Sequence, residues 1–192
     1  MAATKLNVLS ICGSLRKGSY NAMVMRALPG LAPEGMSIKE APPHDSFPLY
    51  NLDIQKEQGI PAAVTVLGDA ILAADGLVIV TPEYNFSVPP GLKNAIDWVS
   101  RLKDNPPFEN KPIAIQSAAT GQLGGARVQY HLRQILNGLD ALILNSPEIF
   151  IGQARTKFDE QKRELTDETT RDFIRKQLAA FAQFIEQVRS KH

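Results

Sequence analysis

TPEYNFSVPPGLKNAIDW, residues 81–98, is the stretch of this 192-residue chain that decides the fold. The apolar run Gly76–Val80 comes directly before it and predicts a strand buried on both faces. Turn residues follow, and apolar positions at helical spacing predict a helix over Pro90–Lys103. Open α/β sheets bind ligands at loops that leave the carboxyl ends of parallel strands. The polar residues Glu83–Asn85 therefore predict a binding loop rather than a mere connector.

Strand and helix patterns alternate along the chain on both sides of this stretch. Strands are predicted at Leu6–Ile11, Ser37–Ala41, Leu77–Thr81, Pro112–Ser117 and Ala141–Leu144, with Ile149–Ile151 open as an extension of the last. Helices are predicted at Ser19–Leu28, Pro61–Ala73, Pro90–Lys103, Val128–Leu139 and from Thr166 onward. These units predict an α/β three-layer sandwich around a five-stranded parallel sheet, in the flavodoxin-like order 2-1-3-4-5. No linker or repeat divides the chain, so residues 1–192 are expected to form a single domain.

Composition excludes several classes of function. The net charge is +1, so neither nucleic acid nor a membrane surface is expected as a partner. No apolar stretch has the length of a membrane span, and residues 1–8 run into the first strand without a signal peptide. Cys12 is the one cysteine and can form no internal disulfide, which favours a cytoplasmic location. The three histidines show no metal-ligand spacing, so no metal site is predicted.

The loop after the first strand, GSLRKGSYN at residues 13–21, suits a phosphate group. Its hydroxyls, its backbone N–H groups and the start of the next helix are donors for an anion. Arg16 adds a forked cationic donor, and Asn21 either fixes the loop or reaches the phosphate. A capped turn with Ser19 as the N-cap is an equally open interpretation. The loop lacks the lysine of a P-loop, and the chain has no G-x-G-x-x-G or G-x-S-x-G motif.

The loop at Pro82–Asn85 suits a flat heteroaromatic ring. Such a ring needs backbone donors along its polar edge and side chains against one face, and this loop offers both. The alternative is that Tyr84 packs on Phe86 or Trp98 while Glu83 faces water. That alternative leaves the polar cluster unexplained and ranks lower.

A third loop, SAATGQLGGAR at residues 117–127, follows the fourth predicted strand. Its small residues let the backbone approach a ring closely, and Ser117 can hydrogen-bond to it. A plain glycine-rich turn between strand and helix is the alternative. In the order 2-1-3-4-5 the first, third and fourth strands are neighbours, so the three loops together predict one ligand site.

At these three loops the chain resembles the NAD(P)H-dependent FMN reductases, which include bacterial chromate, quinone and azo-dye reductases. The resemblance extends over nearly the whole sequence, and the stretch at residues 81–98 is its most specific motif. It implies a flavodoxin-like fold, bound FMN, NADPH or NADH as co-substrate, a small electron acceptor, and a homodimer or homotetramer. The FMN contacts that it implies are Ser14, Arg16, Ser19, Tyr20, Asn21, Pro82, Glu83, Tyr84, Asn85, Ser117 and Gly121.

The implied activity passes a hydride from the nicotinamide to FMN and then on to a quinone, chromate, an azo compound or a free flavin. Because the cofactor performs the chemistry, no catalytic acid, base or nucleophile is predicted. Two alternatives stay open: a flavodoxin-like electron carrier without direct NAD(P)H oxidation, and a non-redox binding protein with this fold. The net charge of +1 does not favour the carrier, since flavodoxins tend to be acidic.

Two loops are long for a compact domain, Pro42–Gly59 and Gly152–Leu165. Within the first, PLYNLD at residues 48–53 resembles a family segment near the subunit interface. The second varies among relatives, so the choice of acceptor is expected to depend on it. On the helix after residue 90, Asp97 and Arg101 are four residues apart and are expected to form a solvated ion pair.

Overall fold

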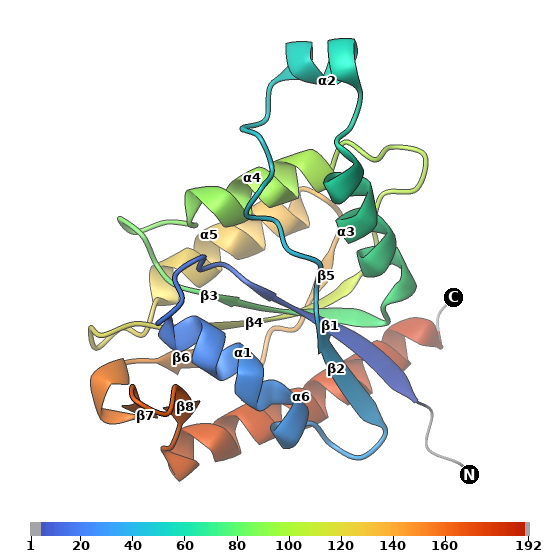
Figure 1. Ribbon diagram of the computed structural model, residues 1–192. Coiled ribbons are helices and arrows are strands. Elements are labelled where there is room, and N and C mark those ends of the chain that lie inside the picture. Colours follow the sequence, from blue (N-terminus) through green and yellow to red (C-terminus); the bar gives the residue numbers. More distant parts are fainter. Residues whose placement is uncertain (1–4, 191–192) are drawn as a thin grey trace.

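The computed structural model describes residues 5–190 and consists of a parallel sheet between two layers of helices (Figure 1). The predicted absence of a signal peptide concerns residues 1–4, which lie outside the described residues, as does His192. The strands are β1 (Leu6–Cys12), β2 (Met36–Glu40), β3 (Gly76–Thr81), β4 (Pro112–Ala118), β5 (Leu142–Ile143), β6 (Ile149–Ile151), β7 (Phe158–Asp159) and β8 (Glu164–Leu165). The helices are α1 (Tyr20–Leu31), α2 (Leu52–Gln58), α3 (Ala62–Ala73), α4 (Pro90–Val99), α5 (Ala126–Asn137), the 3-10 turn η1 (Ala154–Thr156) and α6 (Glu168–Arg189).

The sheet has the predicted order, β2-β1-β3-β4-β5, and the neighbouring strands in it pair in parallel. The prediction for the fifth strand is only partly right, because two short strands occupy that edge. β5 pairs with the start of β4 at Pro112–Ile113, and β6 pairs with its end at Gln116–Ala118. Between β5 and β6 the chain passes through Pro147, which has no N–H to donate to a strand ladder.

The sheet is covered on both faces, which is why its central strands β3 and β4 are mostly apolar. Helices α1 and α6 pack on one face and α3, α4 and α5 on the other (Figure 1). Every residue of β3 and β4 is buried, as predicted for the run that precedes residue 81. Among residues 5–190, no helix combines the length and the apolar character that crossing a bilayer requires.

The two long loops contain elements that the sequence patterns did not predict. Helix α2 lies in the first and has no buried residue, so it carries no apolar periodicity. It stands on an arm that projects from the body beyond α3 and α4 (Figure 1). The second loop holds η1 and the antiparallel pair β7–β8, which lies beside α1. Both segments are therefore ordered parts of the fold.

Candidate functional site

The loops that follow β1, β3 and β4 lie together at the carboxyl edge of the sheet (Figure 1). The first loop is fixed to β3, because the N–H of Gly13 donates to the carbonyl of Val80 at 2.8 Å. A Cβ at Gly13 would lie 2.3 Å from Oγ1 of Thr81, so only glycine fits where the loop leaves the sheet. The three predicted binding loops are thus neighbours in the structure.

The loop after β1 forms the capped turn that was one of the two interpretations of residues 13–21. The Ser19 hydroxyl accepts from the N–H groups of Asn21 and Ala22 at 3.2 and 3.5 Å and caps helix α1. The Ser14 hydroxyl is buried and accepts from the N–H of Arg16 at 3.4 Å. Both serines therefore shape the loop that precedes α1.

The same loop also keeps donors free for an anion. Within the described part of the chain, the N–H groups of Lys17, Gly18 and Tyr20 have no backbone or side-chain acceptor. The guanidinium of Arg16 lies near Gly18, with Nη1 3.8 Å from the position of a Cβ there. Arg16 forms no ion pair with the carboxylates of residues 5–190. The cap and the anion site are compatible, because they use different groups of one loop.

Asn21 joins this loop to the end of β4. Its side-chain Nδ2 donates to the carbonyl of Ala118 at 2.9 Å, and its Oδ1 accepts from the N–H of Ala118 at 2.9 Å. The β3–β4 register ends at the pair Thr81–Ser117, so Ala118 is one residue beyond that ladder. The side-chain amide of Asn21 pairs with the backbone of Ala118 as a neighbouring strand would. Asn21 therefore fixes the loop, which is one of the two roles that its residue type allowed.

Glu83 joins the loop after β3 to the start of α5. Its carboxylate accepts from Nε of Arg127 at 2.7 Å and from the N–H groups of Arg127 and Val128 at 3.1 and 3.3 Å. The guanidinium of Arg127 in turn lies 3.8 Å from the ring centroid of Phe86. The side chain of Glu83 is only 9% exposed, so the alternative in which it faces water is wrong. The carboxylate caps α5, where the positive end of the helix dipole favours it.

The remainder of this loop is tightly turned and open to solvent. Tyr84 and Ser87 exchange two backbone hydrogen bonds of 3.0 Å each. Asn85 and Phe86 between them have φ of 48° and 70°, and bulky residues rarely adopt such values. Tyr84 is exposed, and its ring makes no aromatic pair with Phe86 or Trp98 within residues 5–190. A strained, exposed turn above a rigid strand end is typical of a ligand-binding loop.

Ser117 fixes the third loop through a side-chain hydrogen bond. Its hydroxyl is fully buried, donates to the carbonyl of Gly124 at 2.7 Å and accepts from Nε2 of Gln129 at 2.7 Å. Gly121 belongs to the same loop, and a Cβ there would meet no atom within 4 Å. Open space beside Gly121 leaves room for a ring, whereas the Ser117 hydroxyl is already engaged within the protein.

Tyr20 links the first loop to the segment after β6. Its hydroxyl donates to Oε1 of Glu160, and its ring packs on Phe158 with centroids 5.1 Å apart. The hydrogen bond to Glu160 raises the pKa of Tyr20, and burial adds to this. The same segment is tied to the third loop, since the N–H of Gln153 donates to the carbonyl of Gly121 at 3.0 Å. No local pattern in the sequence indicated these contacts, because they join distant residues.

Free donors at this edge suit FMN, and the buried groups around them hold the donors in place. A phosphate fits Arg16 and the unpaired N–H groups of the first loop at the start of α1. The N–H groups of Glu83 and Asn85, which have no acceptor within residues 5–190, suit the polar edge of a ring. Residues 5–190 contain no group of three or more metal-binding side chains that could hold a metal ion.

Two titratable side chains lie beside the first loop. Burial raises the pKa of the Cys12 thiol, so the thiol stays protonated near neutral pH. Burial also lowers the pKa of His44, while the charge of Asp45 opposes that shift. His44 is therefore neutral in the folded protein near pH 7.

We expect His44 to make the protein less stable in weak acid. Because its pKa is lowered on folding, the unfolded chain binds the proton more readily. Its contribution is complete above about pH 6.5, the ordinary pKa of histidine, and declines as the pH falls towards the folded-state pKa. The free energy of unfolding, measured with urea at several pH values, should fall below pH 6.5 more steeply in the wild type than in His44→Phe. Parallel curves for the two proteins would contradict this.

A flavodoxin-like sheet with anion and ring donors at its carboxyl edge defines a class of flavin-binding α/β proteins. A family model described as NADPH-dependent FMN reductase matches residues 6–156. The quinone reductase of Escherichia coli is 52% identical over 185 residues, which cover 96% of this chain and 98% of that protein. An NAD(P)H-dependent FMN reductase of Pseudomonas aeruginosa is 47% identical over 184 residues, with coverage of 96% and 97%. The chain belongs to the NADPH-dependent FMN reductase family.

A solved structure supports the same assignment. FerB, a flavoenzyme NAD(P)H:(acceptor) oxidoreductase from Paracoccus denitrificans, matches with a TM-score of 0.82 at 32% identity. The match covers 95% of this chain and 98% of FerB. The protein is thus an oxidoreductase with FMN as cofactor and NAD(P)H as co-substrate, as the family resemblance implied. The individual FMN contacts, from Ser14 to Gly121, stay predictions.

Proposed function

We propose that this protein is a quinone reductase that uses NAD(P)H to reduce a quinone to its hydroquinone. Per turnover, one NAD(P)H and one proton from solvent provide the two electrons and two hydrogens that the quinone gains. The similarity to the quinone reductase of Escherichia coli supports this acceptor. The observation on which the proposal mainly rests is that three loops with free donors are locked together at one sheet edge.

FMN, when bound, would supply the two-electron redox chemistry that connects the nicotinamide with the acceptor. In this proposal Arg16 and the N–H groups before α1 bind the phosphate. Glu83 and Asn85 offer backbone N–H donors to the polar edge of the ring, and Pro82 and Tyr84 offer side chains to its face. Asn21 and Ser117, both buried, hold the loops at the spacing that the flavin needs. No side chain is assigned an acid or base role, because the flavin needs none.

The proposal is tested with purified protein and added FMN. We expect flavin absorbance in the protein and direct oxidation of NADH or NADPH that depends on an added quinone. Chromate, an azo dye and free FMN belong in the same screen, with both nicotinamides. Colourless protein that gains no NAD(P)H oxidation on addition of FMN would refute the proposal. Flavin binding without direct NAD(P)H oxidation would instead indicate an electron carrier.

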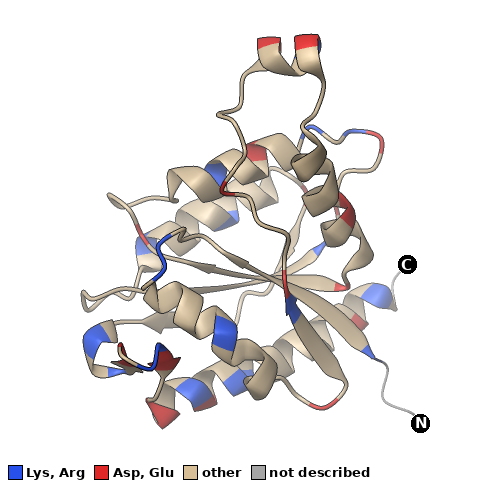
Figure 2. Cartoon of the chain, viewed as in Figure 1, with Lys and Arg blue, Asp and Glu red and all other residues tan. Residues whose placement is uncertain are grey.

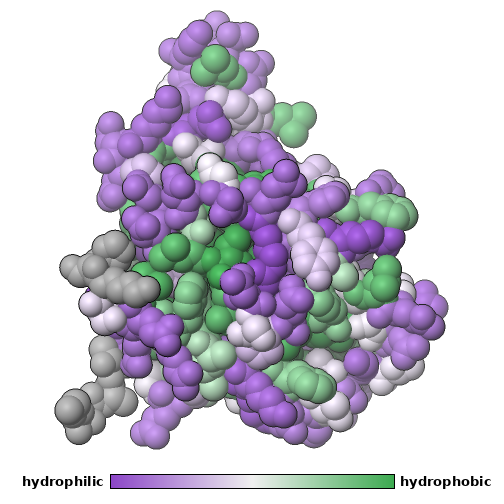
Figure 3. Space-filling model, turned by 180° about the vertical axis from the view of Figure 1, so that it is seen from behind, coloured by the Kyte–Doolittle hydropathy of each residue, from purple (hydrophilic) through white to green (hydrophobic). Residues whose placement is uncertain are grey.

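We also propose that two or more copies associate through the arm that carries α2. Leu49 is 80% exposed and Leu52 is 49% exposed, which leaves apolar side chains without cover. Figure 3 shows apolar side chains on this otherwise polar projection. The base of the arm is rigid, since the carbonyl of Pro48 accepts from Trp98 at 2.7 Å and from Asn94 at 2.9 Å. Light scattering on Leu49→Glu should show a smaller particle than on the wild type, and an unchanged mass would contradict this interface.

A cytoplasmic location is part of the proposal and is supported by the single cysteine. Cell fractionation with an antibody to the protein would test it. Recovery in a secreted or membrane fraction would contradict it.

Glu83→Ala is expected to lower the free energy of unfolding by about 1–2 kcal/mol, because α5 loses its cap and Arg127 its partner. The variant should also bind FMN more weakly, since the Arg127–Phe86 stack that supports the strained turn loses its anchor. Urea unfolding and flavin-fluorescence titration measure the two effects. In the double variant Glu83→Ala/Arg127→Ala, the loss of unfolding free energy should be smaller than the sum of the losses in the two single variants. Additive losses would show that the pair is not coupled.

A further inference from the structure

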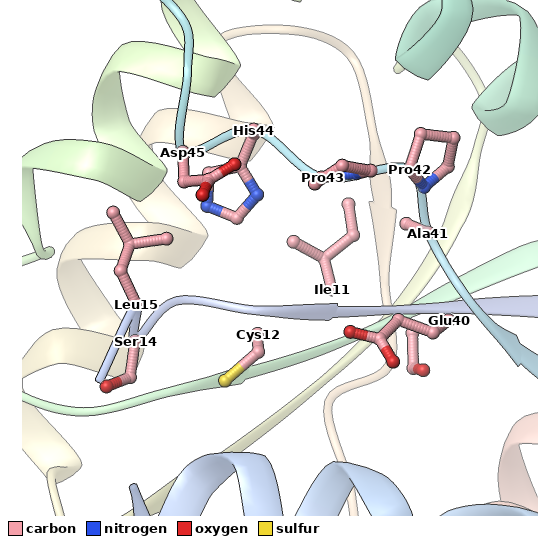
Figure 4. Close-up of a pocket in the computed structure, with 11 residues that line it drawn as sticks. Ile11, Cys12, Ser14, Leu15, Glu40, Ala41, Pro42, Pro43, His44 and Asp45 are labelled. Atoms are coloured by element: carbon pink, nitrogen blue, oxygen red, sulfur yellow. The ribbon is translucent and has the colours of Figure 1, made fainter. Parts of the chain in front are cut away.

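A cavity of about 200 Å³ lies beside the first loop, on its β2 side and away from the loops after β3 and β4 (Figure 4). It is formed by the carboxyl ends of β1 and β2 and by the segment that follows β2. It shares Ser14 and Leu15 with the first loop. Cavities for drug-sized ligands measure about 300–1,000 Å³, so this one has room for a single ring system rather than a whole cofactor.

Part of the cavity wall is apolar. Ile11, Leu15, Pro42 and Pro43 surround the space, and the ring of His44 points into it between Leu15 and Ile11 (Figure 4). Apolar side chains of this kind suit the faces of a flat heterocycle. Proline side chains in particular can contact such a ring without losing rotamer freedom.

The polar groups in the cavity favour an uncharged ring that carries hydrogen-bond donors. His44 is 8% exposed, and its buried Nε2 has no hydrogen-bond partner in the described part of the chain. Unpaired buried nitrogens are costly, so this atom is suited to a ligand partner. Glu40 and Asp45 contribute two carboxylates, and neither forms an ion pair within residues 5–190. The lining contains no lysine or arginine, so a phosphate would be repelled.

Charge changes sign across the first loop. Arg16 and Lys17 are cationic and lie in the loop itself, whereas Glu40 and Asp45 lie on and after β2. In Figure 2 the loop after β1 is blue and the chain after β2 carries red. A ligand that spans the loop would therefore place anionic groups on one side and a neutral, amino-bearing ring on the other.

We propose that this cavity binds the adenine ring of an adenine dinucleotide whose phosphates pass beside Lys17 at the rim of the first loop, next to the FMN phosphate that Arg16 holds. The exocyclic amine of adenine donates to the carboxylate of Asp45 or Glu40, and a ring nitrogen pairs with His44. The inference rests on the proposed function, because NAD(P)H is the adenine dinucleotide that the reaction consumes. FAD, which joins an adenine to the flavin phosphate, offers the same ring from a second source.

The test compares ligands with and without adenine. The FMN-loaded wild type, Asp45→Ala and His44→Phe are assayed with NADH and with reduced nicotinamide mononucleotide, which lacks the adenosine half. Calorimetry with ADP measures adenine binding without turnover, and titration of flavin-free protein compares FAD with FMN. Glu34→Ala is the matched control, since it removes an exposed carboxylate from the turn before β2. Asp45 is also exposed, so its variant is informative even where His44→Phe fails to fold.

We expect KM for NADH and Kd for ADP to rise about tenfold in the cavity variants, as the loss of one hydrogen bond to the ligand predicts. KM for the mononucleotide should stay unchanged. A loss of FAD affinity with unchanged FMN affinity and unchanged KM for NADH would support the cavity with FAD as the source. Equal effects on NADH and the mononucleotide, or no effect on NADH, ADP and FAD, would overturn the inference. A wild type without NADH oxidation would refute the proposed function alone, since ADP and FAD binding still test the cavity.

Discussion

Replacing Asn21 by alanine is expected to lower the free energy of unfolding by about 2–4 kcal/mol, because two buried backbone groups lose their partners. The side chain is 3% exposed, and both of its 2.9 Å hydrogen bonds go to Ala118. Water cannot replace them without opening the contact between α1 and the end of β4. Urea-induced unfolding of flavin-free protein measures the effect without a contribution from bound cofactor.

Ser19→Ala is the matched comparison for Asn21→Ala. It removes the N-cap of the same helix, for which about 0.5–2 kcal/mol is typical. Asn21→Ala should therefore cost more than Ser19→Ala and should also weaken FMN binding, since the first loop loses its fixed distance to the third. Equal costs for the two variants would show that the bridge to β4 adds nothing beyond capping.

Local patterns were sufficient to predict the architecture. The uninterrupted apolar run before residue 81 indicated a central strand, and all residues of β3 are indeed buried. Loops at the carboxyl ends of neighbouring strands could be placed together because parallel topology fixes that edge. Helix α2 was not predicted, because a helix with no buried residue has no periodic pattern of apolar residues.

Side-chain partners could not be predicted, because many possible partners compete for each group. Asp97 was expected to pair with Arg101, but Nζ of Lys93 lies 2.6 Å from its carboxylate instead. Arg101 donates to the backbone carbonyl of Asp97 at 3.1 Å and lies over the ring of Tyr50. Both cations are four residues from Asp97, so sequence spacing alone does not distinguish them; α4 ends at Val99, which leaves Arg101 beyond the helix.

The long-range contacts at the site could likewise not be predicted from the sequence. Asn21 and Ala118 are 97 residues apart, and Tyr20 and Glu160 are 140 apart. For Asn21 the residue type allowed two roles, and only the fold shows that its amide completes a strand ladder. Groups fixed within the protein and groups left free for a ligand thus became separable only in three dimensions.

Arg16→Ala is expected to raise the Kd of FMN about 10–100-fold, the range for losing a hydrogen bond to a charged group. The guanidinium has no carboxylate partner within residues 5–190 and lies near Gly18, in a loop where the N–H groups of Lys17, Gly18 and Tyr20 have no acceptor among those residues. Affinity for riboflavin, which has the ring but no phosphate, should not change. Flavin-fluorescence quenching at a fixed salt concentration measures both constants.

Lys162→Ala is the control for net charge, since Lys162 is 72% exposed and lies 3.9 Å from the carboxylate of Asp159. It should leave FMN binding near the wild-type value. If Arg16→Ala weakened riboflavin and FMN equally, Arg16 would shape the loop rather than bind the phosphate. If neither affinity changed, the phosphate would lie elsewhere along the sheet edge. The difference between the two flavins therefore isolates the charge of Arg16 from its part in folding the loop.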